Sequence, residues 1–291
     1  MDQLLQNAVS ALAAGAIYSI AALGFGVVYN ATKVMNFAHG EFLMMGALIS
    51  AALVNSAGVQ VVLAVATATV IVTLLGIILD RYVIQMAVRK TVLTAVMITI
   101  GAGIAFRGLM VVTVGRDMVF PPAFEGIKTV TVGSIYLPSQ VIWILLLLAA
   151  LSVALAYLFS STRLGKAMRA ASDNPRAAML CGIDIRAMSL VAFAIAASTG
   201  ALAGAFVAPI SSAFYESGLF FGLKGFAAAM LGGLGNPIGA VLGGMLIGLI
   251  ETGSAGYVTS VFKDAIALGL LILVLIVKPD GLLGRAEAKR V

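Results

Sequence analysis

Few side chains in this sequence could carry out bond chemistry. Among its 291 residues, Cys181 is the only cysteine and His39 the only histidine. These allow no internal disulfide, no zinc site of the usual His or Cys type, and no Ser-His-Asp triad except one built on His39. The nucleotide-binding pattern G-x-x-x-x-G-K-[ST] is missing too, since Gly165-Lys166 is followed by Ala167. We therefore expect a protein that is not an enzyme, holds no metal or cofactor, and takes its energy from a partner or an ion gradient.

Polar residues within or beside apolar stretches are the remaining candidates for function. Asn36, His39 and Glu41 open one such stretch, where Asn36 can cap a helix and the helix dipole favours a negative Glu41 by about 0.3–1 kcal/mol. These residues could line or gate a pathway, or form only a capping network. Arg107 could serve function, because intramembrane charges usually do, or could extend to the interface, roughly 9 Å away by helical rise. Glu251 stands near the end of its stretch and is expected to be solvated.

The composition indicates which elements must position these residues. Apolar residues make up 62% of the chain and charged ones 10%, against roughly 25% charged in soluble domains, and mean hydropathy is +1.11. A span needs about 20 apolar residues. Such stretches lie at 5–28, 37–55, 59–79, 92–113, 137–159, 188–208 and 265–277, with an eighth in the Gly-rich region 224–252. The first lacks the basic start of a secretory signal and is expected to be retained. The sequence predicts an all-α, polytopic transmembrane bundle of about eight spans, forming a single domain over 1–291.

Basic residues divide unequally between the two sets of connections. The larger group comprises Lys33, Arg81, Arg89, Lys90, Arg163, Lys166, Arg169, Arg176, Arg186, Lys278, Arg285, Lys289 and Arg290. The smaller group comprises Arg116, Lys128, Lys224 and Lys263. Because cytoplasmic loops carry the excess of Lys and Arg, the larger group is predicted to be cytoplasmic, with the N-terminus outside and the C-terminus inside. The net charge of +6 therefore needs no nucleic acid to explain it.

This orientation requires an odd number of crossings, whereas eight simple spans give an even number. Asn236-Pro237 interrupts the stretch 224–252, and proline breaks the helical hydrogen-bond ladder. We predict a broken or re-entrant element there, which restores the parity. Glycines also recur at every fourth residue (Gly235, Gly239 and Gly243, then Gly244 and Gly248). This spacing favours close helix packing, although free backbone groups at the break could also bind a substrate.

Two connections are long enough to carry structure of their own. The external (periplasmic) loop 114–136 alternates at 129–132 before Gly133, which predicts a small hairpin. In the cytoplasmic loop 160–187, Asn174 and Pro175 begin a helix that ends at Cys181, because Gly182 supplies the left-handed stop. This helix could dock on another subunit, or the loop could be a solvated basic segment that only fixes orientation.

Three motifs resemble those of branched-chain amino acid permeases, the LivH type of ATP-binding-cassette importer. The first is the run Lys33-Val-Met-Asn-Phe-Ala-His-Gly-Glu-Phe42. The second combines Gly165-Lys-Ala-Met-Arg-Ala, Asp173-Asn-Pro and Ala178-x-x-x-Gly182-Ile. The third is the run Lys224-Gly-Phe-Ala-Ala-Ala-Met-Leu-Gly-Gly-Leu-Gly-Asn-Pro-Ile-Gly239. They occur in order along nearly the whole chain.

The resemblance implies a subunit in a bacterial inner membrane that pairs with a second homologous permease subunit, two cytoplasmic ATPases that bind the ATP, and a periplasmic substrate-binding protein. It implies alternating access driven by those ATPases and a coupling role for loop 160–187. The residues implied in coupling are Gly165, Lys166, Arg169, Asn174, Pro175, Ala178 and Gly182. The candidates for a pathway or gate are Asn36, His39, Glu41, Arg107, Asn236 and Pro237.

Other functions remain open at this stage. The ligand could be a branched-chain or other hydrophobic amino acid, or urea, an amide or an organic acid. An ion-coupled secondary transporter would need ionisable relays deep in the bundle, for which the chain offers at most Arg107. A non-transporting scaffold or receptor subunit is the third alternative, against which the glycines and the broken span argue weakly.

Overall fold

The fold, taken from a computed structural model that describes residues 2–87, 91–124, 130–132, 135–257 and 260–284, is a bundle of long helices. These are α1 (Asp2–Thr32), α2 (His39–Asn55), α3 (Val61–Ile78) with its π-helical continuation η1 (Leu79–Ile84), α4 (Val92–Thr113), α5 (Ser139–Ser161), α8 (Ile185–Ser211), α9 (Ser217–Gly232), α10 (Pro237–Tyr257) and α11 (Lys263–Val277). Six of the described helices are long and apolar enough to cross a membrane. The predicted all-α, polytopic bundle is confirmed.

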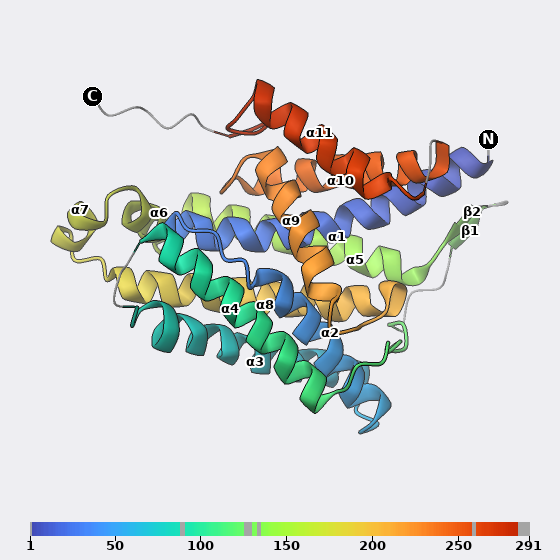
Figure 1. Cartoon of the computed structure of the whole chain (residues 1–291), viewed down its shortest axis with the longest axis horizontal. Coiled ribbons are helices and arrows are strands. Elements are labelled where there is room, and N and C mark those ends of the chain that lie inside the picture. Colours follow the sequence, from blue (N-terminus) through green and yellow to red (C-terminus); the bar gives the residue numbers. More distant parts are fainter. Residues whose placement is uncertain (1, 88–90, 125–129, 133–134, 258–259, 285–291) are drawn as a thin grey trace.

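Smaller elements mark the two ends of the bundle. The short helices α6 (Arg163–Asp173) and α7 (Pro175–Leu180) project at the end where the described chain stops, whereas the N-terminus lies at the opposite end (Figure 1). Near the N-terminal end, β1 (Val130–Val132) pairs antiparallel with β2 (Ile135–Leu137). This ribbon is the hairpin predicted in loop 114–136, although Thr129 and Gly133 themselves lie outside the described residues.

The predicted break in the region 224–252 is confirmed. Two helices, α9 and α10, replace one continuous span, and residues 233–236 form the turn between them. Gly233 and Gly235 have φ of +102° and +80°, a backbone region that favours glycine because other residues carry a Cβ. The extra helix reverses the chain once more, so that the described chain begins and stops at opposite ends of the bundle (Figure 1).

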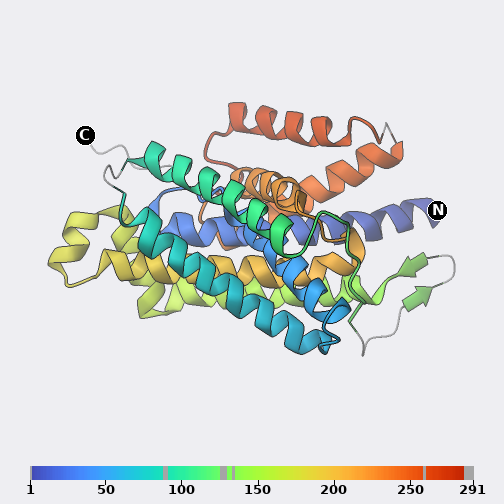
Figure 2. The ribbon, with the colours of Figure 1, turned by 60° about the horizontal axis from the view of Figure 1, so that its bottom comes forward.

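Small residues allow the central helices to approach backbone to backbone. Helix α1 runs through the middle of the bundle in both views, with α10, α8 and α9 against it (Figures 1 and 2). A Cβ on Gly204 would overlap the Leu43 carbonyl oxygen where α8 crosses α2. In α10, Gly239 and Gly243 face α9, whereas Gly244 and Gly248 face α1. The predicted close packing around these glycines is therefore confirmed.

The outer helices present apolar side chains away from the bundle. In α4, only 17% of the apolar stretch is buried within the protein, and the side chains of Leu93, Ile104 and Val112 are largely exposed. Such an exposed apolar surface suits contact with lipid or with a partner subunit, because lipid tails are as apolar as these side chains. Helix α11 also lies on the outside, next to α10 (Figures 1 and 2).

The α2–α8 crossing provides a test of this packing. We expect Gly204→Ala to lower the apparent free energy of unfolding by about 1–3 kcal/mol, because the new methyl group meets backbone that cannot move aside cheaply. Gly101→Ala is the matched control, since a Cβ on this helical glycine would meet nothing within 4 Å. Thermal unfolding and the yield of monodisperse protein in detergent measure the difference. Equal behaviour of the two variants would contradict the packing account.

Candidate functional site

A buried ion pair joins α2 to α4. Arg107 donates through Nη2 and Nε to Glu41 Oε1, at 2.7 and 3.1 Å, and the Glu41 side chain is only 4% exposed. Two glycines make room for the carboxylate: a Cβ on Gly103 would stand 3.3 Å from Glu41 Cγ, and one on Gly218 would crowd Oε2. Arg107 therefore points into the bundle, and the alternative in which its head group extends to the interface is wrong.

A second polar contact ties α4 to the segment that precedes α2. The backbone N–H of Phe37 donates to Thr99 Oγ1 at 3.2 Å, and Thr99 is buried. Helix α4 is otherwise mostly apolar and outward-facing. This hydrogen bond and the Glu41–Arg107 pair add to the apolar packing of Phe106 and Met110 on α2 in fixing the position of α4.

The predicted helix cap at Asn36 is wrong in detail. Helix α2 begins at His39, its N-cap position is Ala38, and no side chain caps it. Instead, Asn36 Oδ1 accepts from the backbone N–H of Ala38 at 3.0 Å, a local turn that precedes the helix. The reason is that Phe37 and Ala38 lie between Asn36 and the first helical turn, so its side chain reaches only the residue two positions on.

His39 occupies the crossing of α1, α2 and α8. Its side chain is fully buried, and its ring meets Phe25 edge-on with 4.9 Å between the ring centroids. A Cβ on Gly24 would overlap this ring, and one on Gly200 would stand 3.3 Å from it. The ring therefore fills space that two glycines leave, on the side of α2 away from Arg107.

Another ionic cluster joins α1, α9, α10 and α11. Lys224 Nζ lies 2.8 Å from Glu251 Oε1 and 2.9 Å from Asp264 Oδ1, and Lys263 Nζ lies 3.3 Å from Glu251 Oε1. The Tyr18 hydroxyl donates to Glu251 Oε2 at 2.7 Å. The expectation that Glu251 is solvated is wrong, because its side chain is 7% exposed and carries these partners. Lys224, grouped above with loop residues, lies within α9.

Asn236 and Pro237 lie apart from these clusters, at the α9–α10 turn. Asn236 Oδ1 accepts from the backbone N–H groups of Ile238 and Gly239 at 3.1 and 3.3 Å, so it caps α10, and Pro237 is the first helical residue. The turn's own backbone groups are also taken: Asn30 Nδ2 donates to the Gly235 carbonyl at 2.7 Å. The break therefore serves as a packed turn, and these backbone groups are already bound within the chain.

The segment 163–180 is built as a rigid projection from α5. Thr162 caps α6 by accepting from Gly165 N at 3.1 Å, and Gly165 packs directly on the Leu158 carbonyl. Arg169 donates to the Phe159 carbonyl oxygen, and Lys33 Nζ lies 3.6 Å from Asp173 Oδ1. These contacts fix α6 to the ends of α5 and α1.

The predicted helix after Asn174 is confirmed. Asn174 Oδ1 accepts from Ala177 N at 3.1 Å, Pro175 starts α7, and Gly182 follows with φ of +79°. The helix ends at Leu180, one residue earlier than predicted.

The exposed side chains of α7 differ from those singled out in the sequence. Ala178 is buried against the chain itself, at 4% exposure, whereas Lys166 and Pro175 are exposed. Met179 and Leu180 are 56% and 90% exposed, an unusual position for apolar residues at the tip of a projecting loop. Sequence reasoning missed both, although two large apolar residues on a helix this short were an available signal.

Comparisons with known proteins agree with this architecture. The family model described as "Branched-chain amino acid transport system / permease component" matches residues 7–275. The high-affinity branched-chain amino acid transport system permease protein LivH of Escherichia coli K12 is 32% identical, covering 99% of this chain and 97% of the relative. BraD of Pseudomonas aeruginosa, with the same description, is 31% identical over 99% and 98%. The ribose import permease protein RbsC of Haemophilus influenzae is 29% identical over 84% and 76%. No solved structure matches significantly.

The Glu41–Arg107 pair provides a prediction about stability. Arg107→Ala leaves a buried carboxylate without its partner, so we expect the apparent free energy of unfolding to fall by about 3 kcal/mol. The double variant Glu41→Ala/Arg107→Ala should lose less than the sum of the single variants, because neither charge is stranded. Denaturation of the detergent-solubilised protein measures the cycle, with Arg116→Ala, at an exposed site, as control. Additive losses would show that the pair is not coupled.

Proposed function

From the premise that this chain belongs to the family of branched-chain amino acid transport permease components, and is a permease subunit of an ATP-binding-cassette importer, we propose that it translocates branched-chain or other hydrophobic amino acids. The observation that carries the proposal is coverage: relatives named for this transport match along almost their whole length, whereas the ribose permease matches less of both chains.

The proposed assembly supplies what the chain lacks. The sequence has no phosphate-binding loop, so ATP would be bound and hydrolysed on two cytoplasmic ATPase subunits, and this subunit would be non-catalytic. A second, homologous permease subunit would complete the membrane pathway, and a substrate-binding protein would deliver the ligand from outside. The largely exposed apolar face of α4 is available for such a membrane partner.

We place the end of the bundle that carries α6 and α7 in the cytoplasm, with the N-terminus outside and the C-terminus inside a bacterial inner membrane. The unequal distribution of Lys and Arg supports this orientation. The described chain begins and stops at opposite ends of the bundle, which also supports it (Figure 1).

In this orientation, α7 would be the surface that the ATPases move. Leu180 and Met179 would enter an apolar groove on an ATPase, and burial of two large apolar side chains would stabilise the contact by about 1.5–3 kcal/mol each. Displacement of α7 would then pass through α6 to the ends of α5 and α1, along Arg169–Phe159 and Lys33–Asp173. Alternating access would follow if these helix ends move together.

The ligand is tested by reconstituting the subunit with its co-purifying partners in liposomes. We expect the binding protein loaded with leucine, isoleucine or valine to stimulate ATP hydrolysis several-fold over the unloaded binding protein. Stimulation by urea, an amide or an organic acid instead would keep the importer and change its cargo. Uptake by the chain alone down an ion gradient would overturn the proposal in favour of a secondary transporter.

The coupling role is tested by Leu180→Ser. We expect ligand-stimulated ATP hydrolysis and uptake to fall at least about tenfold while insertion and unfolding temperature stay unchanged, because the side chain touches little of its own chain. Met118→Ser is the matched control, since Met118 is an exposed apolar residue (62%) that follows the C-terminal end of α4 and lies outside α7. Full activity of the Leu180 variant would contradict the docking role of α7.

A further inference from the structure

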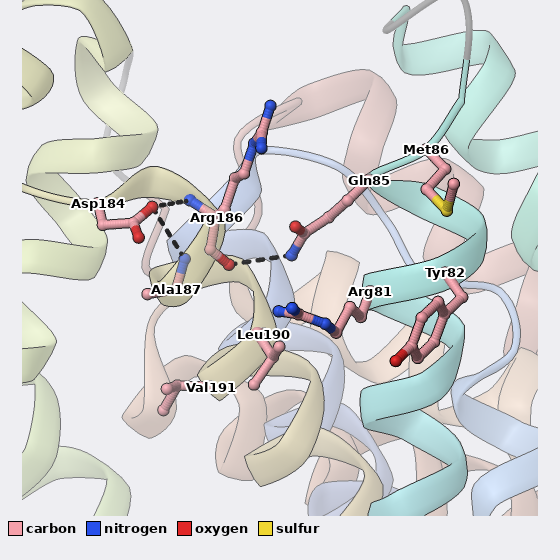
Figure 3. A pocket seen from close by; sticks show the side chains of 9 residues that line it. All are labelled: Arg81, Tyr82, Gln85, Met86, Asp184, Arg186, Ala187, Leu190 and Val191. Atoms are coloured by element: carbon pink, nitrogen blue, oxygen red, sulfur yellow. Dashed lines mark hydrogen bonds between the residues drawn. The ribbon is translucent and has the colours of Figure 1, made fainter.

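A cavity of about 680 Å³ opens between η1 and the first turns of α8, outside all the sites described above. Arg81, Tyr82 and Met86 line one side, and Arg186, Leu190 and Val191 line the other. Figure 3 shows Arg81 reaching across the cavity toward α8, with Arg186 extending at its rim. The Arg81 guanidinium thus lies inside a concave site with apolar and aromatic walls, whereas the Arg186 side chain extends away from Arg81 at the edge of that site (Figure 3).

The walls of the cavity are held in place by buried polar contacts. Asp80, which is fully buried in η1, accepts from the Ser189 hydroxyl at 2.7 Å and from Gln85 Nε2 at 2.5 Å. Gln85 Nε2 also donates to the Arg186 carbonyl at 3.0 Å. These bonds fasten the π-helical turn to α8, and π-helical turns are frequent at functional sites. The cavity is therefore a built feature of the fold rather than a gap between mobile segments.

The charge in the cavity is positive and available. Among the described residues, neither the Arg81 nor the Arg186 guanidinium has an ion pair or a hydrogen bond. The carboxylate of Asp184 also lines the cavity, but its Oδ1 accepts from the backbone N–H groups of Arg186 and Ala187, at 2.9 and 3.2 Å. Asp184 keeps its negative charge as the cap of α8, so two guanidinium groups against one carboxylate leave the lining net positive, and guanidinium groups bind phosphate in bidentate fashion.

The position of the cavity indicates where that anion comes from. Residues 61–84 form one apolar helix of membrane-spanning length, and Arg81 stands in its last turn. Ile78, Tyr82 and Met86, at 48%, 61% and 69% exposure, continue its outward apolar surface to the cavity. A ligand here would meet positive charge at the end of a span and an apolar surface beside it, which is the arrangement of a lipid at the interface.

We propose that this cavity binds the phosphate head group of an anionic phospholipid, with Arg81 on the phosphate, Arg186 adding positive charge at the rim, and the acyl chains along Tyr82, Met86 and the outer face of α3. The cytoplasmic leaflet follows if the orientation proposed above holds, but the binding itself does not depend on transport. The lipid would stabilise the contact between η1, at the end of α3, and the start of α8, which follows the segment 163–180 in the chain.

The test measures lipid retention by the purified importer complex. Native mass spectrometry of the complex, exchanged into detergent with phosphatidylglycerol or with phosphatidylcholine of the same acyl chains, reports the bound species. We expect phosphatidylglycerol to bind in preference, and Arg81→Gln/Arg186→Gln to weaken its binding at least about tenfold. Arg163→Gln is the matched control, because Arg163 is an exposed arginine at the same end of the bundle but outside the cavity.

Three results would overturn the proposal. Equal retention of phosphatidylglycerol by the double variant and by the Arg163 control would show that the cavity does not bind it. Competition by free glycerol phosphate as effective as that by the lipid would identify a site for soluble anions. Retention only after removal of the ATPase subunits would show that this face is covered by protein. If the unmodified complex retains phosphatidylglycerol but does not transport amino acids, the lipid site is supported and only the function proposed above fails.

Discussion

The absence of water from the bilayer core is the constraint on which this structure depends. A buried charge or backbone group must find its partner within the protein, because an unsatisfied one costs several kcal/mol. The chain contains few charges, and two buried carboxylates meet partners on other helices: Glu41 with Arg107, and Glu251 with Lys224, Lys263 and Tyr18. Each pairing removes a cost and at the same time fixes the position of a helix.

Two kinds of contact therefore coexist in the bundle. In the centre, glycines let α1, α2, α8 and α10 meet at backbone distance, where a methyl group added at Gly46, Gly204 or Gly244 would overlap a neighbour. At the periphery, α4 and α11 add ion pairs and a hydrogen bond to their apolar contacts with the centre. Backbone contacts leave no alternative arrangement, whereas side-chain pairs can separate and re-form. In an importer that alternates between two states, we expect the central stack to move as a unit and the ion-paired helices to move against it.

The segment 163–180 is held firmly enough by local contacts to transmit a displacement to the helices. Thr162 and Asn174 accept hydrogen bonds from backbone N–H groups in the first turns of α6 and α7. Gly165 packs on the Leu158 carbonyl, which holds α6 close against α5. Met179 and Leu180 at the end of this segment are apolar and exposed, so a partner can bind them without displacing contacts within this chain. The cavity between η1 and α8 lies near the place where this segment returns to the membrane. Motor docking and lipid binding would then act on the same helix.

The sequence by itself determined the features that depend on neighbouring residues. Spans follow from apolar runs, the helix after Asn174 from a cap, a proline and a glycine, and the α9–α10 break from Asn236-Pro237. Only the tertiary structure decided which distant residues meet: that Arg107 pairs with Glu41, that Glu251 is buried rather than solvated, and that Ala178 turns inward while Leu180 is exposed. Asn36 combines both cases. Its turn with Ala38 is local, but residue type does not show where α2 begins, and α2 begins too far along the chain for Asn36 to cap it. The physical reason is that caps and breaks are satisfied within a few residues, whereas a buried charge is satisfied by whichever helix the packing brings beside it.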